Sequence, residues 1–137
     1  MNDDYRGKIR NREAAGQLKD FSGLRYGKIT PTDIDGFADF QNKAFVIFEV
    51  KYGTAPVPYG QRLALERLAD ACEAGGVRSL VIVAHHQVKM PADINVAELP
   101  ATKVRMKGKW IKPNVPHTVK SAFDSFLVWV EKENKKA

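Results

Sequence analysis

Two apolar segments separated by an amphipathic one constrain the fold more than any other feature of this chain. Residues 44–51 (AFVIFEVK) have the composition of a strand, and residues 77–84 (VRSLVIVA) are a nearly continuous aliphatic run, typical of a strand covered on both faces. Residues 61–73 between them have a helical period, with an inner face formed by Gln61, Leu65, Leu68 and Cys72. A strand, a helix and a strand in this order form a βαβ unit, which makes the two strands parallel. We therefore predict an α/β domain.

An acidic segment comes directly before the first of these strands. A polar turn at residues 41–43 joins the two, so we expect an antiparallel hairpin. A loop at these positions sets Asp35 opposite Glu49 and Asp33 opposite Lys51. Carboxylates crowded beside apolar strands are costly unless a cation binds among them. The hairpin therefore predicts a metal site.

The other expected elements complete a sheet between helices. We expect a first helix at residues 6–20 and a first strand at residues 24–30. The acidic strand is expected at residues 33–40, and a C-terminal helix at residues 119–132. Thr118 can N-cap the last helix, whose apolar stripe should dock on the core and consists of Phe123, Phe126, Leu127 and Val130. Residues 102–110 alternate basic and other side chains, and form either a peripheral strand or a basic loop. His85 and His86 end the buried strand and point to opposite faces, so they cannot chelate one metal together.

An aspartate followed on the next strand by Glu-x-Lys has a chemical logic. Carboxylates such as Asp35 and Glu49 bind a hard divalent ion, Mg²⁺ or Mn²⁺, through oxygen and leave water positions open. The metal lowers the pKa of a bound water and neutralises charge that builds on a phosphate oxygen. Lys51 can orient the attacking water or help to deprotonate it, and the carbonyl of Val50 is near enough to add a ligand. The alternative is a surface strand pair held by cross-strand ion pairs, which does not explain why Glu49 follows a segment fit for burial.

The order of these elements resembles the core of the PD-(D/E)XK nuclease superfamily across about residues 6–84. The resemblance implies a restriction-endonuclease-like αβββαβ core with a mixed central sheet flanked by helices, here followed by a C-terminal helix. It assigns the three positions of the motif to Asp35, Glu49 and Lys51, with Asp33 as a substitute or helper. No literal Pro-Asp pair is present, which leaves open which aspartate is the principal ligand, and we favour Asp35.

Two further residues match accessory positions of Holliday-junction resolvase-like or VRR-NUC-like members. Glu13 lies where such members carry a metal-supporting acid on the first helix, although burial statistics for glutamate alone favour a solvated helix charge. Gln61 lies where several members carry a glutamine on the helix after the motif. An inward amide at that place would bind either a DNA phosphate or the motif lysine. The resemblance thus adds Glu13 and Gln61 to the expected catalytic group.

The activity that this resemblance implies is a Mg²⁺- or Mn²⁺-dependent DNA endonuclease, in which activated water attacks a backbone phosphate. Branched, recombination or repair DNA is the expected substrate, and RNA is not excluded. A homodimer and a phage origin would suit so small a nuclease. The alternative is a catalytically inactive DNA-binding or assembly module with the same fold.

The positive charge of the chain is concentrated near its C-terminal end. The formal net charge is +6, with 13 Lys and Arg against 13 Asp and Glu in residues 1–100, and 9 against 3 in residues 101–137. A basic excess on one segment suits a polyanion such as nucleic acid, and a solvated Lys-rich surface is the alternative. The residues that we expect to contact nucleic acid are Lys103, Arg105, Lys107, Lys109 and Lys112.

Length and apolar content indicate a single domain over residues 1–137, with its core at about 6–84 and a basic extension at about 101–137. One cysteine, Cys72, excludes an internal disulfide and fits a reducing compartment. We see no secretory signal and no run long enough to span a bilayer, so we expect a cytoplasmic protein without a membrane partner.

Overall fold

The computed structural model describes residues 7–136, and the chain divides between Thr32 and Asp33 into two compact units. The first unit contains α1 (Arg12–Ala15) and a 3-10 turn, η2 (Ser22–Leu24). Asn11 caps α1 by accepting a hydrogen bond from the Ala14 backbone N–H at 3.0 Å. None of the residues 7–32 is buried.

Two expectations for this unit are wrong. The helix expected at residues 6–20 is the four residues of α1, because its apolar side chains have nothing to pack on: Ile9 is 77% and Leu18 is 99% exposed. Short helices without tertiary burial are marginal in water. The strand expected at residues 24–30 is also absent, because Gly27 adopts a positive φ of 61° and the chain turns back on itself there. Tyr26 and Ile29 then pair only with each other.

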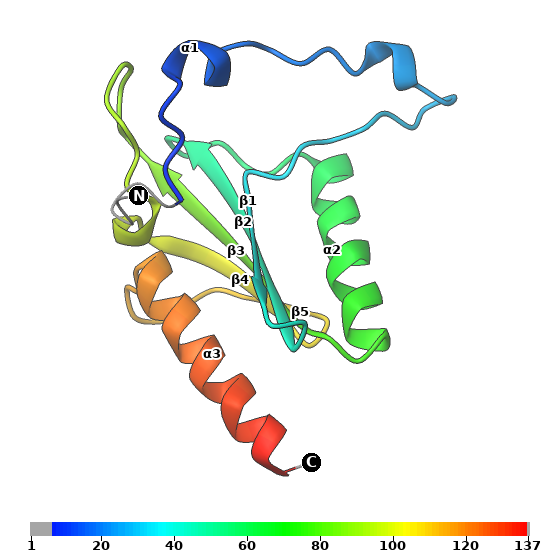
Figure 1. The fold of residues 1–137 in the computed structure, drawn as a ribbon, viewed down its shortest axis with the longest axis vertical. Helices are drawn as coiled ribbons and strands as arrows, with labels where there is room; N and C mark the ends of the chain where they lie inside the picture. The colour runs from blue at the N-terminus through cyan, green and yellow to red at the C-terminus, as the bar shows by residue number, and fades with distance from the viewer. Residues whose placement is uncertain (1–6, 137) are drawn as a thin grey trace. The chain divides into compact units, whose positions relative to one another are not determined.

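The second unit is built on a mixed five-stranded sheet (Figure 1). Its strands, in spatial as well as chain order, are β1 (Gly36–Phe40), β2 (Ala44–Tyr52), β3 (Arg78–His86), β4 (Ala101–Met106) and β5 (Lys109–Ile111). The β2–β3 pair is parallel, as the βαβ unit predicts, and all other neighbouring pairs are antiparallel. The predicted fold class, α/β with a mixed sheet flanked by helices and a C-terminal helix, is confirmed.

Two helices cover opposite faces of this sheet (Figure 1). On one face α2 (Tyr59–Ala74) packs Leu65 and Ala69 against Ile47 and Val81. Leu68, expected on the inner face, is 39% exposed. The buried face of α2 is instead centred on residues four apart, which stack on one side of a helix.

The other face carries α3 (Val119–Lys136), whose buried side chains include Phe126 and Val130. Phe123 stacks on Phe48 with ring centroids 5.7 Å apart. The predicted N-cap is confirmed, since the Thr118 hydroxyl accepts a hydrogen bond from the Ser121 backbone N–H at 3.1 Å. A short 3-10 turn, η3 (Val96–Glu98), precedes β4. None of the helices in the described part of the chain combines the length and apolarity that crossing a bilayer demands.

The hairpin of β1 and β2 has the predicted register. Gly36 pairs with Phe48, and Gln41 and Asn42 take positive φ angles of 53° and 59°, the conformation that tight hairpins favour. The pairing starts at Gly36, where a Cβ atom would lie 3.1 Å from the Phe48 ring, so the glycine allows the two strands to approach without moving that ring. The acidic strand was expected to begin at Asp33, but residues 33–35 precede β1 instead.

Candidate active site

The most unusual side chain of the sheet is the Glu49 carboxylate. It lies on β2 and is 1% exposed, and Ile47 and Val81 are buried on the same face. Its Oε1 accepts a hydrogen bond from Gln61 Nε2 at 2.9 Å and lies 3.2 Å from Lys51 Nζ. Its Oε2 is buried and accepts no hydrogen bond from a donor in residues 7–136, and the neighbouring Asp35 carboxyl can share a hydrogen bond with Glu49 only when one of the two acids is protonated. A buried charged oxygen left in this way is costly unless something else binds it.

Strand alternation and one helical turn bring the three side chains together. Glu49 and Lys51 are two residues apart on β2, so both face α2. Gln61 is in the first turn of α2, one turn before the buried Leu65. Lys51 Nζ donates to Gln61 Oε1 at 2.9 Å, which closes a triangle of contacts. Gln61 thus contacts the motif lysine, one of the two partners expected for it, and its binding of a DNA phosphate stays a prediction.

Asp35 lies beside this triangle. Its Oδ2 accepts a hydrogen bond from the Val50 backbone N–H at 2.7 Å, which fixes the aspartate next to Glu49 although it precedes β1. The expected pairing of Asp33 with Lys51 does not form: Asp33 is exposed, and the Lys51 ammonium contacts Gln61 and Glu49 instead. The carbonyl of Val50 as a metal ligand stays a prediction.

The electrostatics of Glu49 follow from this placement. Burial, reinforced by the negative charge of Asp35, raises the pKa of Glu49 to about 7, and the Lys51 ammonium opposes the rise. Near neutral pH the Glu49 carboxylate is therefore poised to hold either a proton or a cation.

The donor set fits a hard divalent ion. The carboxylates of Glu49 and Asp35 are oxygen ligands, and the unpartnered Oε2 of Glu49 is a vacant acceptor. Residues 7–136 contain no group of three or more His, Cys, Asp or Glu side chains placed to hold a metal. A cation bound by two carboxylates would complete its shell with water or phosphate oxygens, as Mg²⁺ usually does.

Glu13 belongs to the first unit, where it lies exposed on α1. Its expected support of a metal stays a prediction. The described contacts of the second unit therefore define the site through Asp35, Glu49, Lys51 and Gln61 alone.

The five basic residues expected to contact nucleic acid do not form one surface. Arg105 is the clearest correction: it is 8% exposed, and its Nη2 binds both oxygens of Asp70 at 2.9 and 3.1 Å. Its guanidinium is engaged within the fold, so we no longer count it as a nucleic-acid contact. Lys107 lies over the Trp129 ring of α3, 4.7 Å from its centroid, while Lys109 is exposed at the edge strand.

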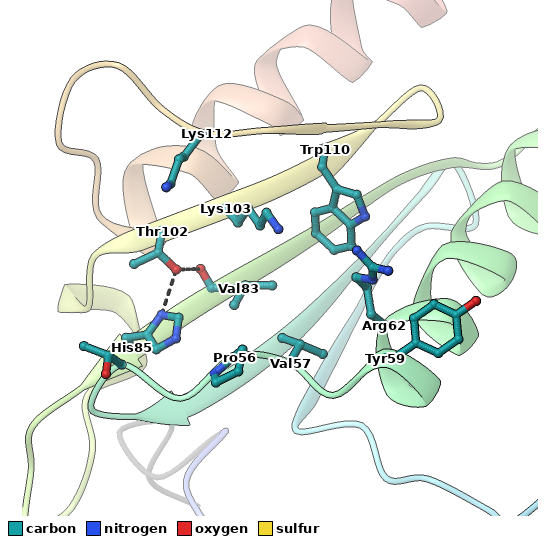
Figure 2. Close-up of a pocket in the computed structure, with 11 residues that line it drawn as sticks. Pro56, Val57, Tyr59, Arg62, Val83, His85, Thr102, Lys103, Trp110 and Lys112 are labelled. Carbon is teal, nitrogen blue, oxygen red and sulfur yellow. Dashed lines mark hydrogen bonds between the residues drawn. The ribbon is translucent and has the colours of Figure 1, made fainter.

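The remaining pair, Lys103 and Lys112, lies on the α2 face and lines a pocket of about 400 Å³ (Figure 2). The sequence did not predict that the following lining residues belong to a site: Thr54, Pro56, Val57, Tyr59, Arg62, Val83, His85 and Thr102. Trp110 completes the wall. It packs half-buried against the Leu65 cluster and also faces the pocket. The sequence signal that could have pointed to this pocket is the position of Arg62 directly after Gln61.

Comparisons with models of known protein families, with curated proteins and with solved structures found no match for this chain. The likeness to the PD-(D/E)XK superfamily therefore rests on the types, spacing and order of the residues around Glu49 and Lys51.

Proposed function

We propose that this chain is a divalent-metal-dependent nuclease that hydrolyses phosphodiester bonds in DNA. The observation that carries the proposal is the Glu49 carboxylate, which is buried, has an unpartnered Oε2, and is next to Asp35. A purely structural carboxylate at this place would have both oxygens satisfied. One that binds a cation would leave an oxygen free in the unliganded chain.

Glu49 and Asp35 are the residues that would hold the metal. When bound, a divalent cation would neutralise charge on a phosphate oxygen and lower the pKa of water. The chain prepares this arrangement before any ligand arrives, since the Val50 N–H fixes Asp35 and the Gln61 amide fixes Glu49. Preorganised groups of this kind need no reorganisation when charge develops.

Lys51 would act on the attacking water or on the phosphate. Its ammonium is held by Gln61 Oε1 at 2.9 Å and by Glu49 Oε1 at 3.2 Å, and its side chain is 21% exposed. A lysine held at two points but still open to solvent can donate to an oxygen that enters the site. Gln61 is a positioning residue in this scheme, because it contacts both Glu49 and Lys51 and so fixes their side chains relative to each other.

The charge distribution favours a polyanionic substrate. The net charge is +6, and Arg62, Lys103 and Lys112 lie on the same face of the sheet as Glu49 and Lys51. Phosphate backbones bind such clusters through Coulomb attraction and counterion release.

A second candidate, a DNA-binding or assembly module without catalysis, has one observation in its favour. Residues 7–136 hold no cluster of three metal-ligating side chains, so the site depends on two carboxylates. Retention of a buried Glu49 with Lys51 beside it argues against this candidate, because an inactive module gains nothing from that costly charge.

The deciding experiment is incubation of the whole chain with Mg²⁺ or Mn²⁺ and a panel of plasmid, linear duplex, single-stranded, four-way-junction and flap DNA. We expect metal-dependent cleavage that Glu49→Gln and Asp35→Asn reduce by more than about 100-fold, since partners outside the ligand shell alone typically account for 10–100-fold. The matched control is Glu133→Gln, which removes a carboxylate at the far end of α3 that pairs with Lys136 at 3.4 Å. Cleavage by both site variants at the rate of the control would refute the assignment. DNA binding without cleavage under any metal would favour the inactive module.

A further inference from the structure

The pocket lined by Lys103 and Lys112 is next to the candidate active site. Val83 and His85, which line it, are the cross-strand partners of Glu49 and Lys51 in the β2–β3 ladder. Neighbouring strands lie about 5 Å apart, and the side chains at these positions point to the same face. Tyr59 and Arg62, which line the pocket (Figure 2), are close to Gln61 in the sequence of α2. The pocket and the Glu49 cluster therefore share two strands and one helical turn.

The pocket carries positive charge that the fold does not neutralise. Neither the Lys103 nor the Lys112 ammonium makes an ion pair within residues 7–136, and no Asp or Glu of the described chain lines the pocket. Arg62 has one distant carboxylate, Glu66, at 3.8 Å. Three cations around one recess of about 400 Å³ favour an anionic occupant.

Besides the polar Thr54, Thr102 and His85, the rest of the lining is apolar or aromatic, which a phosphate alone would not require. The Trp110 ring is held in one orientation, because its Nε1 donates to Glu66 Oε2 at 2.9 Å. Tyr59 is 69% exposed, with the Arg62 guanidinium 5.4 Å from the centre of its ring. An aromatic and apolar wall beside cations is the arrangement that binds a nucleobase together with its phosphate. The pocket volume is within the range of small-ligand sites.

Hydrogen bonds hold the walls in place without a ligand (Figure 2). One ring nitrogen of His85, Nε2, is 2.8 Å from the Ala55 carbonyl oxygen, which ties the loop between β2 and α2 to β3. The other, Nδ1, is 2.8 Å from the Thr102 hydroxyl, which donates to the Val83 carbonyl at 3.1 Å. Loop, β3 and β4 are thus joined around the recess, and a preformed pocket loses little entropy when it binds.

We propose that this pocket binds one unpaired nucleotide of the DNA substrate, with its base against the Trp110 and Tyr59 side and its phosphate near Lys103 and Lys112. This inference rests on the proposed function, because the nucleotide in the pocket would belong to the DNA that the nuclease cleaves. A base that is paired and stacked in a duplex cannot enter a recess, whereas a base in a single-stranded extension can. The favoured substrate is then a duplex with an unpaired strand next to the cleaved bond, such as a flap or an overhang.

The test compares two fluorescent DNA probes that differ only in a short single-stranded thymine extension on a closed hairpin duplex. Binding to the whole chain is measured by fluorescence anisotropy in EDTA, so that no cleavage interferes. We expect the extended probe to bind about 10-fold more tightly, which is the contribution of one or two stacked bases. Equal affinity for the two probes would overturn the proposal.

Two variants locate the effect. Tyr59→Leu and the double variant K103Q/K112Q should each remove most of the preference for the extended probe. The double variant K132Q/K135Q, which removes the same charge from exposed positions on α3, should lower both affinities together and keep their ratio. A ratio that K103Q/K112Q leaves unchanged, in a protein with unaltered thermal unfolding, would refute the site.

The two proposals fail separately in this design. Cleavage of DNA with Mg²⁺ but no preference for the extended probe would keep the nuclease and remove the nucleotide pocket. A preference for the extended probe without any metal-dependent cleavage would keep a pocket for unpaired nucleic acid and remove the nuclease.

Discussion

Replacing Glu49 with glutamine should stabilise the metal-free protein, increasingly so as the pH rises. Burial, together with the charge of Asp35, raises the pKa of Glu49 from 4.5 to about 7 in the folded chain. Protonated Glu49 contributes stability that is fully present below the unfolded-state pKa and is lost as the pH rises through the folded-state pKa. At about 1.4 kcal/mol for each unit of pKa, the difference between 4.5 and 7 corresponds to about 3 kcal/mol lost across this window. Glutamine has no proton to lose, so the variant should lack this decline.

The assay is urea unfolding followed by the fluorescence of Trp110 and Trp129, repeated in EDTA between about pH 5 and pH 8.5. The wild-type free energy of unfolding should fall relative to that of Glu49→Gln by about 2.5 kcal/mol over this range, which begins just above the unfolded-state pKa of 4.5. Glu133→Gln is the control, because an ion pair near the surface contributes about 0–1 kcal/mol. A difference between wild type and Glu49→Gln that stays constant with pH would refute the reasoning, since Glu49 would then titrate as an ordinary carboxylate.

Three further outcomes are expected. Mn²⁺ at about 100 times its dissociation constant should raise the wild-type free energy of unfolding near pH 8 by about 3 kcal/mol and leave Glu49→Gln unchanged; a rise in both would place the metal elsewhere. Lys51→Met should slow DNA hydrolysis about 10-fold or more while calorimetric Mn²⁺ affinity changes little, and unchanged turnover would remove the lysine from the mechanism. Asp70→Asn should cost about 1–3 kcal/mol in urea unfolding, because it deprives buried Arg105 of its carboxylate. DNA affinity should not change in that variant, and a large drop would return Arg105 to the binding surface.

The parts of the fold that sequence predicted are those set by local pattern. Alternation along residues 44–51 and a short polar turn determine the hairpin register, and the helix between two apolar segments determines the parallel pair. The same two rules place Glu49, Lys51 and Gln61 on one face, which is why the sequence alone could predict this part of the candidate site.

The parts that sequence missed depend on partners distant in the chain. The first helix has good helix-forming residues but no burial, so propensity alone overstated it. Arg105 carries the charge of a DNA contact, yet Asp70, 35 residues away, holds it inside the fold. The pocket likewise joins the loop after β2 to β4 through His85, a meeting that no periodicity encodes.

The position of both proposed sites follows from the single parallel pair. Parallel strands bring their carboxyl ends to one edge of a sheet, and ligands of open α/β sheets bind beyond that edge. Glu49 and Lys51 come just before β2 ends at Tyr52, and His85 comes just before β3 ends at His86. The chain leaves β2 at this edge, passes the pocket, and enters α2 with Gln61 in its first turn. The carboxylate cluster and the cationic pocket are therefore neighbours because one βαβ crossover forms both of them. A phosphate bound in the pocket would lie beside β3, and the Glu49 cluster lies on the adjacent strand, β2.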